Sequence, residues 1–184
     1  MDVFGWLKGN ARKSTSERKR WKDAWTAAID REDGGQVEPL RAALDSLQQQ
    51  PADDVEVELE MLDALEQLAA VRGAGTLPRV ETQHRVIAGE RCHFSAPASL
   101  PDDPAQASGR VLFTPSRSIF VGGARTQPVA WHAVKDAIRA ERDVLFVRAD
   151  GSAAAHFRFN TYGDAVLARY LALRLKGARA TRDL

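Results

Sequence analysis

Hydrophobic residues in the first part of the chain recur with the period of an α-helix. Ser14 and Glu17 have the spacing of a capping box, in which each side chain satisfies a free amide of the first helical turn. Five apolar residues then follow at positions i, i+3, i+4, i+7 and i+8, which makes one stripe along a helix. They are Trp21, Ala24, Trp25, Ala28 and Ile29. We therefore predict a helix that begins at Ser14 and ends before Gly34 and Gly35.

Two further segments before residue 73 have the same helical spacing. The third segment runs from a predicted N-cap at Asp53 to about Arg72. Its stretch 55–60 alternates like a strand, but the poor strand propensity of Glu favours a helix. The apolar faces comprise Val37, Leu40, Leu44 and Leu47 in the second segment, which Pro51 follows, and Leu62, Leu65, Leu68 and Ala69 in the third. Three amphipathic helices with short connections predict a small bundle.

The hydrophobic period changes to two after a predicted linker at residues 73–80. Short runs rich in Val, Ile and Phe alternate there with Gly, Pro, Asp and Asn, which is typical of antiparallel strands. Residues 126–141 fit either a helical turn or two strands, and we favour the strands. A final amphipathic helix is predicted, with Thr161 and Asp164 in its first turn and Gly177 at its C-terminal cap. The clear strand runs are 85–97, 109–114, 117–123, 143–150 and 153–160.

Six or seven short antiparallel strands followed by one helix resemble the order of a pleckstrin-homology (PH)-like barrel. Members of its GRAM branch carry a hairpin of the form Gly-x-Leu-x-Leu-Thr-x-x-Arg-Leu-x-Phe, and residues 88–94 resemble the strand before it. The matching residues here are Gly109, Val111, Phe113, Thr114, Arg117 and Phe120. The chain departs from the form at Ser118, and the resemblance covers about residues 85–177.

The resemblance implies an α+β fold in which a PH/GRAM-like antiparallel β-barrel is capped by the C-terminal helix. Together with the helical pattern before residue 73, it predicts five parts along the chain. These are a flexible aromatic and basic arm (1–13), a three-helix module (14–72), a linker (73–80), a PH/GRAM-like domain (81–178) and a tail (179–184).

The polar residues of the hairpin have a structural interpretation and a ligand-binding one. Pro115 fixes φ at the start of a turn, and Thr114 and Ser116 can form hydrogen bonds with nearby backbone amides. Arg117 can lay its stem along the sheet while its head reaches a carbonyl or a carboxylate. We predict that the motif residues Gly109, Thr114, Arg117 and Phe120 are structural.

Charge divides the chain into blocks although the net charge is only +1. Residues 1–31 contain 8 Lys or Arg and 4 Asp or Glu, whereas residues 32–66 contain 1 and 11. The acidic block is predicted either to pair within the fold or to mediate self-association or contact with a basic partner. The excess of Arg over Lys and the abundance of Ala are typical of a GC-rich bacterial genome.

The amino terminus combines aromatic and basic residues that could dock weakly on anionic lipid. The residues of this membrane hypothesis are Phe4, Trp6, Leu7, Lys8, Arg12 and Lys13. The alternative is that Phe4 and Trp6 pack on the fold or on a partner chain. No stretch has the length of a membrane span or of a signal peptide, and Cys92 is the one cysteine. We therefore expect a cytoplasmic protein, with peripheral contact to the inner face of the membrane as an option.

Candidate chemistry is sparse. Cys92 and His93 are neighbours on a predicted strand, so their side chains should point to opposite faces. Asp102 and Asp103 lie in a predicted solvated turn. The four His residues lack metal-ligand spacing, and no phosphate-binding or nucleophile motif is present. We expect no enzyme activity, no metal and no cofactor.

Phosphate recognition by the predicted domain is also disfavoured. The resemblance implies that phosphoinositides would bind around the loop after the first strand, and the predicted loop here, residues 95–108, contains no Lys or Arg. The basic stretch at the amino terminus is short and lacks a stacking platform, so nucleic acid is not an expected partner. We predict a non-catalytic adaptor that binds a protein partner or itself, with a peripheral membrane adaptor and a small enzyme of unknown class as alternatives.

Overall fold

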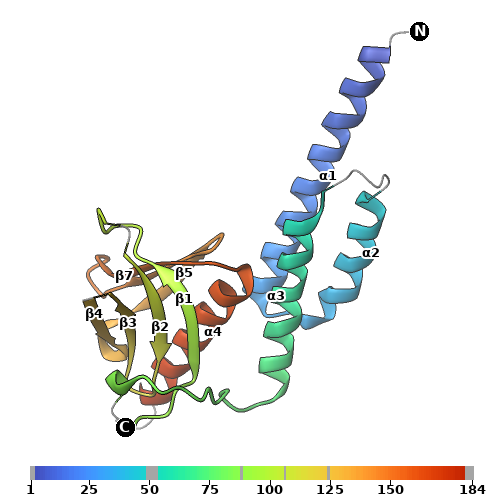
Figure 1. Cartoon of the computed structure of the whole chain (residues 1–184). Helices are drawn as coiled ribbons and strands as arrows, with labels where there is room; N and C mark the ends of the chain where they lie inside the picture. Colours follow the sequence, from blue (N-terminus) through green and yellow to red (C-terminus); the bar gives the residue numbers. More distant parts are fainter. Residues whose placement is uncertain (1–2, 49–53, 88, 106, 124, 181–184) are drawn as a thin grey trace. The chain divides into compact units, whose positions relative to one another are not determined.

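The computed structural model describes the backbone of residues 3–48, 54–87, 89–105, 107–123 and 125–180, and the side chains from Thr15 to Ala178 within these ranges. The chain divides into two compact units, Met1–Ala70 and Val71–Leu184 (Figure 1). Each unit has its own buried core.

The first unit consists, in its described part, of three α-helices and a short 3-10 helix. They are α1 (Val3–Arg31), η1 (Gly34–Gln36), α2 (Val37–Leu47) and α3 (Glu56–Gly73), whose last residues pass the boundary at Ala70. Helix α1 begins at Val3, so the predicted start at Ser14 is wrong and the backbone of residues 3–13 continues the helix. Residues 3–13 contain no proline to stop a helix, and the Ser14–Glu17 spacing also fits a helix interior.

Two tryptophans of α1 tie the three helices together. Trp21 donates its indole N–H to the carbonyl of Leu40 in α2 at 2.8 Å. Trp25 donates its own indole N–H to the carbonyl of Met61 in α3. Both rings are buried, so each contributes apolar burial without leaving its polar atom unpaired. The predicted inward faces of α2 and α3 are confirmed by the burial of Leu40, Leu44, Leu62, Leu65 and Leu68.

The second unit is built on one antiparallel sheet and a C-terminal helix (Figure 1). Its strands in chain order are β1 (Phe94–Ser99), β2 (Ser108–Phe113), β3 (Arg117–Gly122), β4 (Arg125–Ala130), β5 (Asp136–Ala140), β6 (Asp143–Val147) and β7 (Ala153–Phe159). The two strands predicted within residues 126–141 are confirmed as β4 and β5, with the 3-10 helix η3 (Trp131–Ala133) between them. A further 3-10 helix, η2 (Arg85–Ile87), precedes β1.

The sheet is not closed into a barrel, which corrects that part of the prediction. The strand order is β4-β3-β2-β1-β7-β6-β5, so β4 and β5 are the end strands and do not pair with each other. Strand β1 joins the two halves because it pairs with β2 along its length and with β7 only through Ala98 and Ser99.

Aromatic side chains fill the core of the sheet. The ring of Trp131 lies 5.0 Å from that of Phe113 and 5.7 Å from that of Phe146, and Phe146 lies 5.5 Å from Phe157. Phe157 and Phe159 point inward, as the alternation along β7 predicts, while the intervening Arg158 is exposed.

Helix α4 (Tyr162–Ala180) follows β7 directly. The hydroxyl of Thr161 accepts the amide N–H of Asp164 at 3.0 Å, which confirms the predicted cap. The predicted end at Gly177 is wrong, because the helix continues to Ala180. A single glycine costs a helix only about 1 kcal/mol, so it need not terminate one.

Candidate functional site

The turn between β2 and β3 is held by Thr114. Its hydroxyl oxygen accepts the backbone N–H of Ser116 at 3.3 Å and that of Arg117 at 3.2 Å. Thr114 is fully buried, and its carbonyl accepts the indole N–H of Trp131 at 2.8 Å. The local hydrogen bonds expected from the sequence are therefore present, and the Thr114 hydroxyl is engaged within the turn.

Arg117 reaches both a carboxylate and a carbonyl, as its position in the hairpin predicts. Its guanidinium lies 3.0 Å from a carboxylate oxygen of Glu90 and donates to the carbonyl of Val86 at 3.5 Å. Ser116 donates its hydroxyl to the other oxygen of Glu90 at 2.6 Å. No sequence signal marks Glu90 as this partner, because it is distant in the chain from Arg117 and belongs to no motif of the hairpin.

The Glu90 carboxylate is stabilised in its charged form. Burial raises its pKa, but hydrogen bonds from Ser116 and Thr114 and the charge of Arg117 together outweigh burial and hold the pKa below its ordinary value of 4.5. The side chain is 28% exposed, so it is only partly screened by solvent. Glu90 therefore anchors the segment before β1 to the β2–β3 turn.

We expect Glu90→Gln to lower the free energy of unfolding at pH 7 by about 1.5–3 kcal/mol, the usual contribution of a hydrogen bond to a charged group. Because the folded pKa is the lower one, the stabilisation is complete above pH 4.5 and is lost as pH falls through the folded pKa. Urea denaturation of both proteins between pH 7 and pH 3 measures this convergence. Glu81→Gln, on the same segment but exposed, is the control; an equal loss in both variants would contradict the role of Glu90.

Residues 79–87 and 89–92 cover the outer face of β2 and β3. An isolated bridge joins Val80 to Cys92, with the N–H of Val80 donating to the carbonyl of Cys92 at 2.9 Å. The segment packs on Leu112 and Ile119, which face each other across the two strands. The cluster consists of Ile87, Cys92, Leu112 and Ile119, with Val80, Val86 and Val121 against it. This cover explains why β2 and β3 carry apolar residues on both faces.

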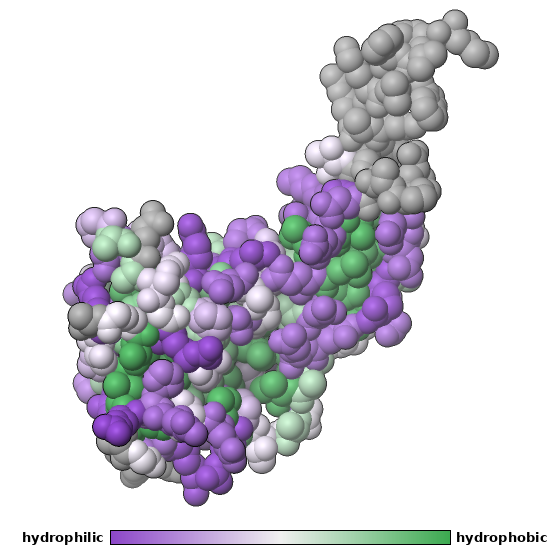
Figure 2. All heavy atoms as spheres, in the orientation of Figure 1, coloured by the Kyte–Doolittle hydropathy of each residue, from purple (hydrophilic) through white to green (hydrophobic). Residues whose placement is uncertain are grey.

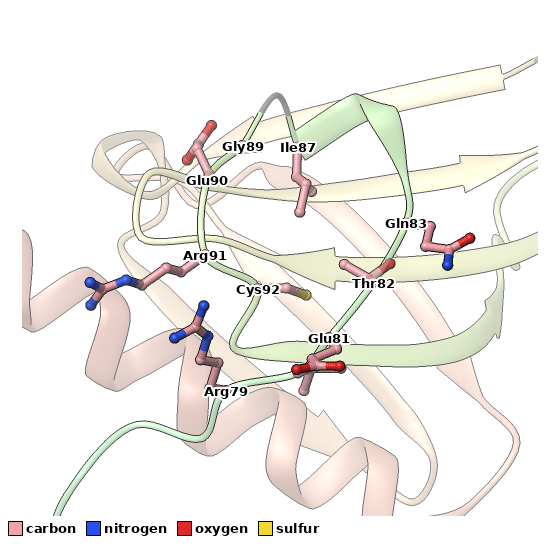
Figure 3. Close-up of a pocket in the computed structure, with 10 residues that line it drawn as sticks. Arg79, Glu81, Thr82, Gln83, Ile87, Gly89, Glu90, Arg91 and Cys92 are labelled. Carbon is pink, nitrogen blue, oxygen red and sulfur yellow. The ribbon is translucent and has the colours of Figure 1, made fainter.

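The same segment borders an open pocket of about 510 Å³ (Figure 3). Its apolar lining is Val80, Ile87 and Cys92, and its charged lining is Arg79, Glu81, Glu90 and Arg91, with Thr82, Gln83 and Gly89 completing the wall. Figure 3 shows the side chains of Arg79 and Arg91 extending to the same side. The sequence signal for this pocket is weak, because its residues come together only through the bridge.

Cys92 and His93 do not form a thiol–base pair. Cys92 is buried and its thiol donates to the carbonyl of Phe94 at 3.0 Å, while His93 places Nδ1 2.7 Å from the carbonyl of Pro78. Burial raises the pKa of the Cys92 thiol, which keeps it protonated at neutral pH. The prediction that the two side chains point apart is confirmed.

The loop between β1 and β2 is tied down by its two aspartates. Asp103 pairs with Arg125 and its side chain is 13% exposed, so the predicted solvated turn is wrong for this residue. Asp102 is 73% exposed and lies 3.1 Å from Nδ1 of His156. The local sequence does not specify that β4 and β7 bring Arg125 and His156 to this loop.

A second ion pair lies beside this loop. Arg158 donates two hydrogen bonds to Asp143, each of 2.8 Å, and Nε2 of His156 lies 3.9 Å from the same carboxylate. The bonds from Arg158 hold the pKa of Asp143 below its ordinary value. Within the described ranges, no group of three or more His, Cys, Asp or Glu is placed to hold a metal ion.

The two end strands of the sheet, β4 and β5, differ in their proline content and in their exposed apolar side chains. Strand β4 contains Pro128, which has no N–H to donate to a further strand. Strand β5 has no proline and carries Ile138, whose side chain is 50% exposed. On the neighbouring strand β6, the half-buried Leu145 lies opposite Ile138. Val147, also on β6, lies opposite Asp136.

The helical unit has an apolar groove between α1 and α2, with a volume of about 480 Å³. Figure 2 shows apolar side chains gathered on this unit. The groove is lined by Glu17, Arg20, Trp21, Ala24, Leu40, Ala43, Ser46 and Leu47.

The residues of the membrane hypothesis lie on α1, but their side chains are outside the described part of the structure. They are Phe4, Trp6, Leu7, Lys8, Arg12 and Lys13. Their contact with lipid stays a prediction. In the described part of the chain, no helix combines the length and apolarity that crossing a bilayer requires.

No family model and no curated protein matches the chain. Among solved structures, the C-terminal domain of an unknown protein from Leishmania infantum is 17% identical, with 49% of this chain and 88% of that chain covered and a TM-score of 0.42. Inner Membrane Complex Sub-compartment Protein 3 from Toxoplasma gondii is 14% identical, with 45% and 73% covered and a TM-score of 0.35. The linker-DH/PH domains of p115-RhoGEF are 10% identical, with 83% and 55% covered and a TM-score of 0.43.

The strand order and the C-terminal helix of the second unit are those of a PH-like fold. Its described part has seven antiparallel strands in the order β4-β3-β2-β1-β7-β6-β5, followed by one helix that packs against β5 and the neighbouring strands. The Gly109–Phe120 hairpin forms β2 and β3 of this sheet. The expected fold order is therefore present, as an open sheet.

Proposed function

We propose that this chain is a non-catalytic adaptor whose PH-like domain, of GRAM-like type, binds an extended segment of a protein partner along β5. The supporting observation is the exposure of Ile138 on an end strand. Among the described residues, Val57, Leu59 and Ile138 are the exposed large apolar side chains, and Ile138 is the most exposed. An exposed apolar side chain on an end strand of a sheet is a suitable contact for an added strand.

The surroundings of β5 support this assignment. Helix α4 is fixed at both ends of the strand, by Lys176 on the carbonyl of Lys135 and by Tyr162 on the carboxylate of Glu141. Leu145 and Val147 extend the apolar surface from Ile138 onto β6. A partner strand would gain backbone hydrogen bonds from β5 and apolar contacts from alternate side chains.

The helical module supplies a second contact surface in this proposal. Val57 and Leu59 are 40% and 45% exposed near the start of α3, among the acidic residues Glu56 and Glu60. Apolar residues within an acidic surface suit self-association or a partner with basic and apolar side chains. The adaptor is proposed to act in the cytoplasm, and neither metal nor cofactor forms part of its action.

The strand-addition proposal is tested by selecting binders from a library of random 12-residue peptides displayed on phage against the full chain. We expect binders with apolar residues at alternate positions, and we expect Ile138→Asp to weaken their binding at least tenfold, because it places a charge in the apolar contact. Affinities are measured by fluorescence polarisation.

Thr126→Asp is the matched control, because Thr126 is exposed on the opposite end strand β4. The control should leave affinity unchanged. The proposal fails if no peptide is selected, or if Ile138→Asp leaves the affinity of the selected peptides intact.

A further inference from the structure

The groove between α1 and α2 has a lining that suits a further helix. Most of the lining is apolar or small, and small residues on a helix surface let the backbone of a second helix approach closely. The buried or half-buried apolar residues of the lining are Trp21, Leu40 and Leu47, and its exposed small residues are Ala24, Ala43 and Ser46. The groove therefore offers an apolar contact together with room for a helix.

Helix α1 is much longer than α2, which packs against it. It spans 29 residues, or about 43 Å, whereas α2 spans 11 residues, or about 16 Å. The last residue of α2, Leu47, lines the groove together with Glu17, and α3 begins close to Lys22, which lies 3.4 Å from Glu58. The first turns of α1, about four in number, therefore continue past both helices (Figure 1). A helical stretch of this length is only marginally stable without a packing partner.

The projecting turns and the region of the groove carry opposite charge. Residues 3–13 contain three basic residues and no acidic one, which gives a net charge of +3. Residues 24–47, from the groove residue Ala24 to the end of α2, contain five Asp or Glu and two Arg, which gives −3. Residues 3–13 also contain the apolar Phe4 and Leu7. A helix with basic and apolar residues is complementary to an apolar groove in acidic surroundings.

A second copy of the chain can bring the projecting turns to the groove. Because α1 is continuous, its first turns cannot fold back onto the groove of the same chain. Glu17 and Arg20 both line the groove and are one turn apart, so they lie on the same side of α1. If two α1 helices run antiparallel with a two-fold axis between these residues, each Glu17 meets Arg20 of the other copy. In this register, residues 6–13 of one copy lie beside residues 24–31 of the other.

We propose that the chain forms a two-fold symmetric dimer in which each α1 runs antiparallel to α1 of the other copy. The first turns of each α1 cover the groove of the other copy, and two Glu17–Arg20 pairs fix the register. The dimer surface belongs to the helical unit and includes neither β5 nor Val57 and Leu59 of α3. The proposal therefore goes beyond the function proposed above.

The test is sedimentation equilibrium of the full chain at micromolar to submillimolar concentrations. We expect the mass to rise from 20.2 kDa toward twice that value, with a Kd in the micromolar range. Ala43→Arg places a long charged side chain in the groove and should weaken the dimer at least tenfold. Ala42→Arg is the matched control, because Ala42 is exposed on the same helix but outside the groove lining. It should leave the Kd unchanged.

Charge variants test the register. Glu17→Arg leaves only positive charge at the two pairing positions and Arg20→Glu leaves only negative charge, so each variant alone should dimerise at least tenfold more weakly. An equimolar mixture of the two variants restores both opposite-charge pairs and should dimerise with the affinity of the unsubstituted chain. Because mixing changes nothing within either chain, this recovery reports a contact between copies. Circular dichroism shows that each variant retains its helices.

A chain that stays at 20.2 kDa over the whole concentration range would overturn the proposal. So would equal weakening by Ala43→Arg and Ala42→Arg. A mixture of the two charge variants that dimerises no better than either variant alone would also overturn it. Peptide binding at β5 is measured separately, so the dimer and the strand-addition proposal can fail independently.

Discussion

Replacing Trp131 by alanine will lower the free energy of unfolding of the PH-like domain by about 3–5 kcal/mol, the usual range for removing a buried aromatic ring. The ring is 1% exposed and contacts the rings of Phe113 and Phe146. The substitution opens a cavity between these rings. It also removes the indole N–H that the carbonyl of Thr114 accepts, which leaves a buried acceptor unpaired.

The stability of the PH-like domain should be measured separately from that of the helical unit, because the chain has two compact units. The substitution also removes the tryptophan of the PH-like domain. Native-state amide hydrogen exchange of β6 and β7 reports the free energy of opening of the domain core. His132→Ala, an exposed neighbour in η3, is the control and should change exchange little.

Trp131→Phe separates the two contributions. It keeps an aromatic ring in the core but removes the hydrogen bond to Thr114, so we expect a smaller loss of about 1–3 kcal/mol. A loss below 1 kcal/mol for Trp131→Ala would contradict the central place of this ring. Folded domains are stable by about 5–15 kcal/mol. After the expected loss, the alanine variant is therefore either folded with a measurable free energy of unfolding or observably unfolded.

Elements that depend on local pattern were predictable from the sequence. The alternation along β7 places Phe157 in the core and Arg158 outside, and the helical stripe places Trp21 and Trp25 inside. Side-chain period and burial are linked directly, because successive residues of a strand point to opposite faces.

Element ends were less predictable because capping residues also occur inside helices. Ser14 lies within α1, and Gly177 lies within α4. A cap residue contributes about 1 kcal/mol, and packing or uninterrupted helical propensity can exceed this. Closure of the sheet was also beyond the pattern, since it depends on whether the end strands β4 and β5 pair with each other.

Contacts between distant residues account for what the sequence could not predict at the candidate site. The partner of Arg117 was expected to be a carbonyl or carboxylate, but its identity as Glu90 depends on the path of residues 79–87 and 89–92 over β2 and β3. The burial of Asp103 depends in the same way on Arg125. The exposure of Ile138 follows from the position of β5 at the end of the sheet, which local alternation does not specify.

Gly109→Ala will lower the free energy of unfolding of the PH-like domain by about 3 kcal/mol, toward the upper end of the range for overpacked sites. A Cβ at this position would lie 2.3 Å from the carbonyl oxygen of Val121 and 2.6 Å from the Cα of Gly122. These are backbone atoms of the paired strand β3, so they cannot move aside as a flexible side chain can. Relief of the contact requires β2 and β3 to separate locally.

Gly177→Ala is the matched control for this prediction. An added Cβ at Gly177 meets no atom within 4 Å, and Gly177 lies inside α4, so alanine should leave stability unchanged or raise it by up to about 1 kcal/mol. Hydrogen exchange of β2 and β3 measures both variants, with exchange of α1–α3 as an internal reference. If Gly109→Ala left the hydrogen exchange of β2 and β3 unchanged, this would contradict the close approach of these two strands. It would then remove the physical reason for glycine at the first position of the hairpin motif and reopen a ligand-binding interpretation for that position.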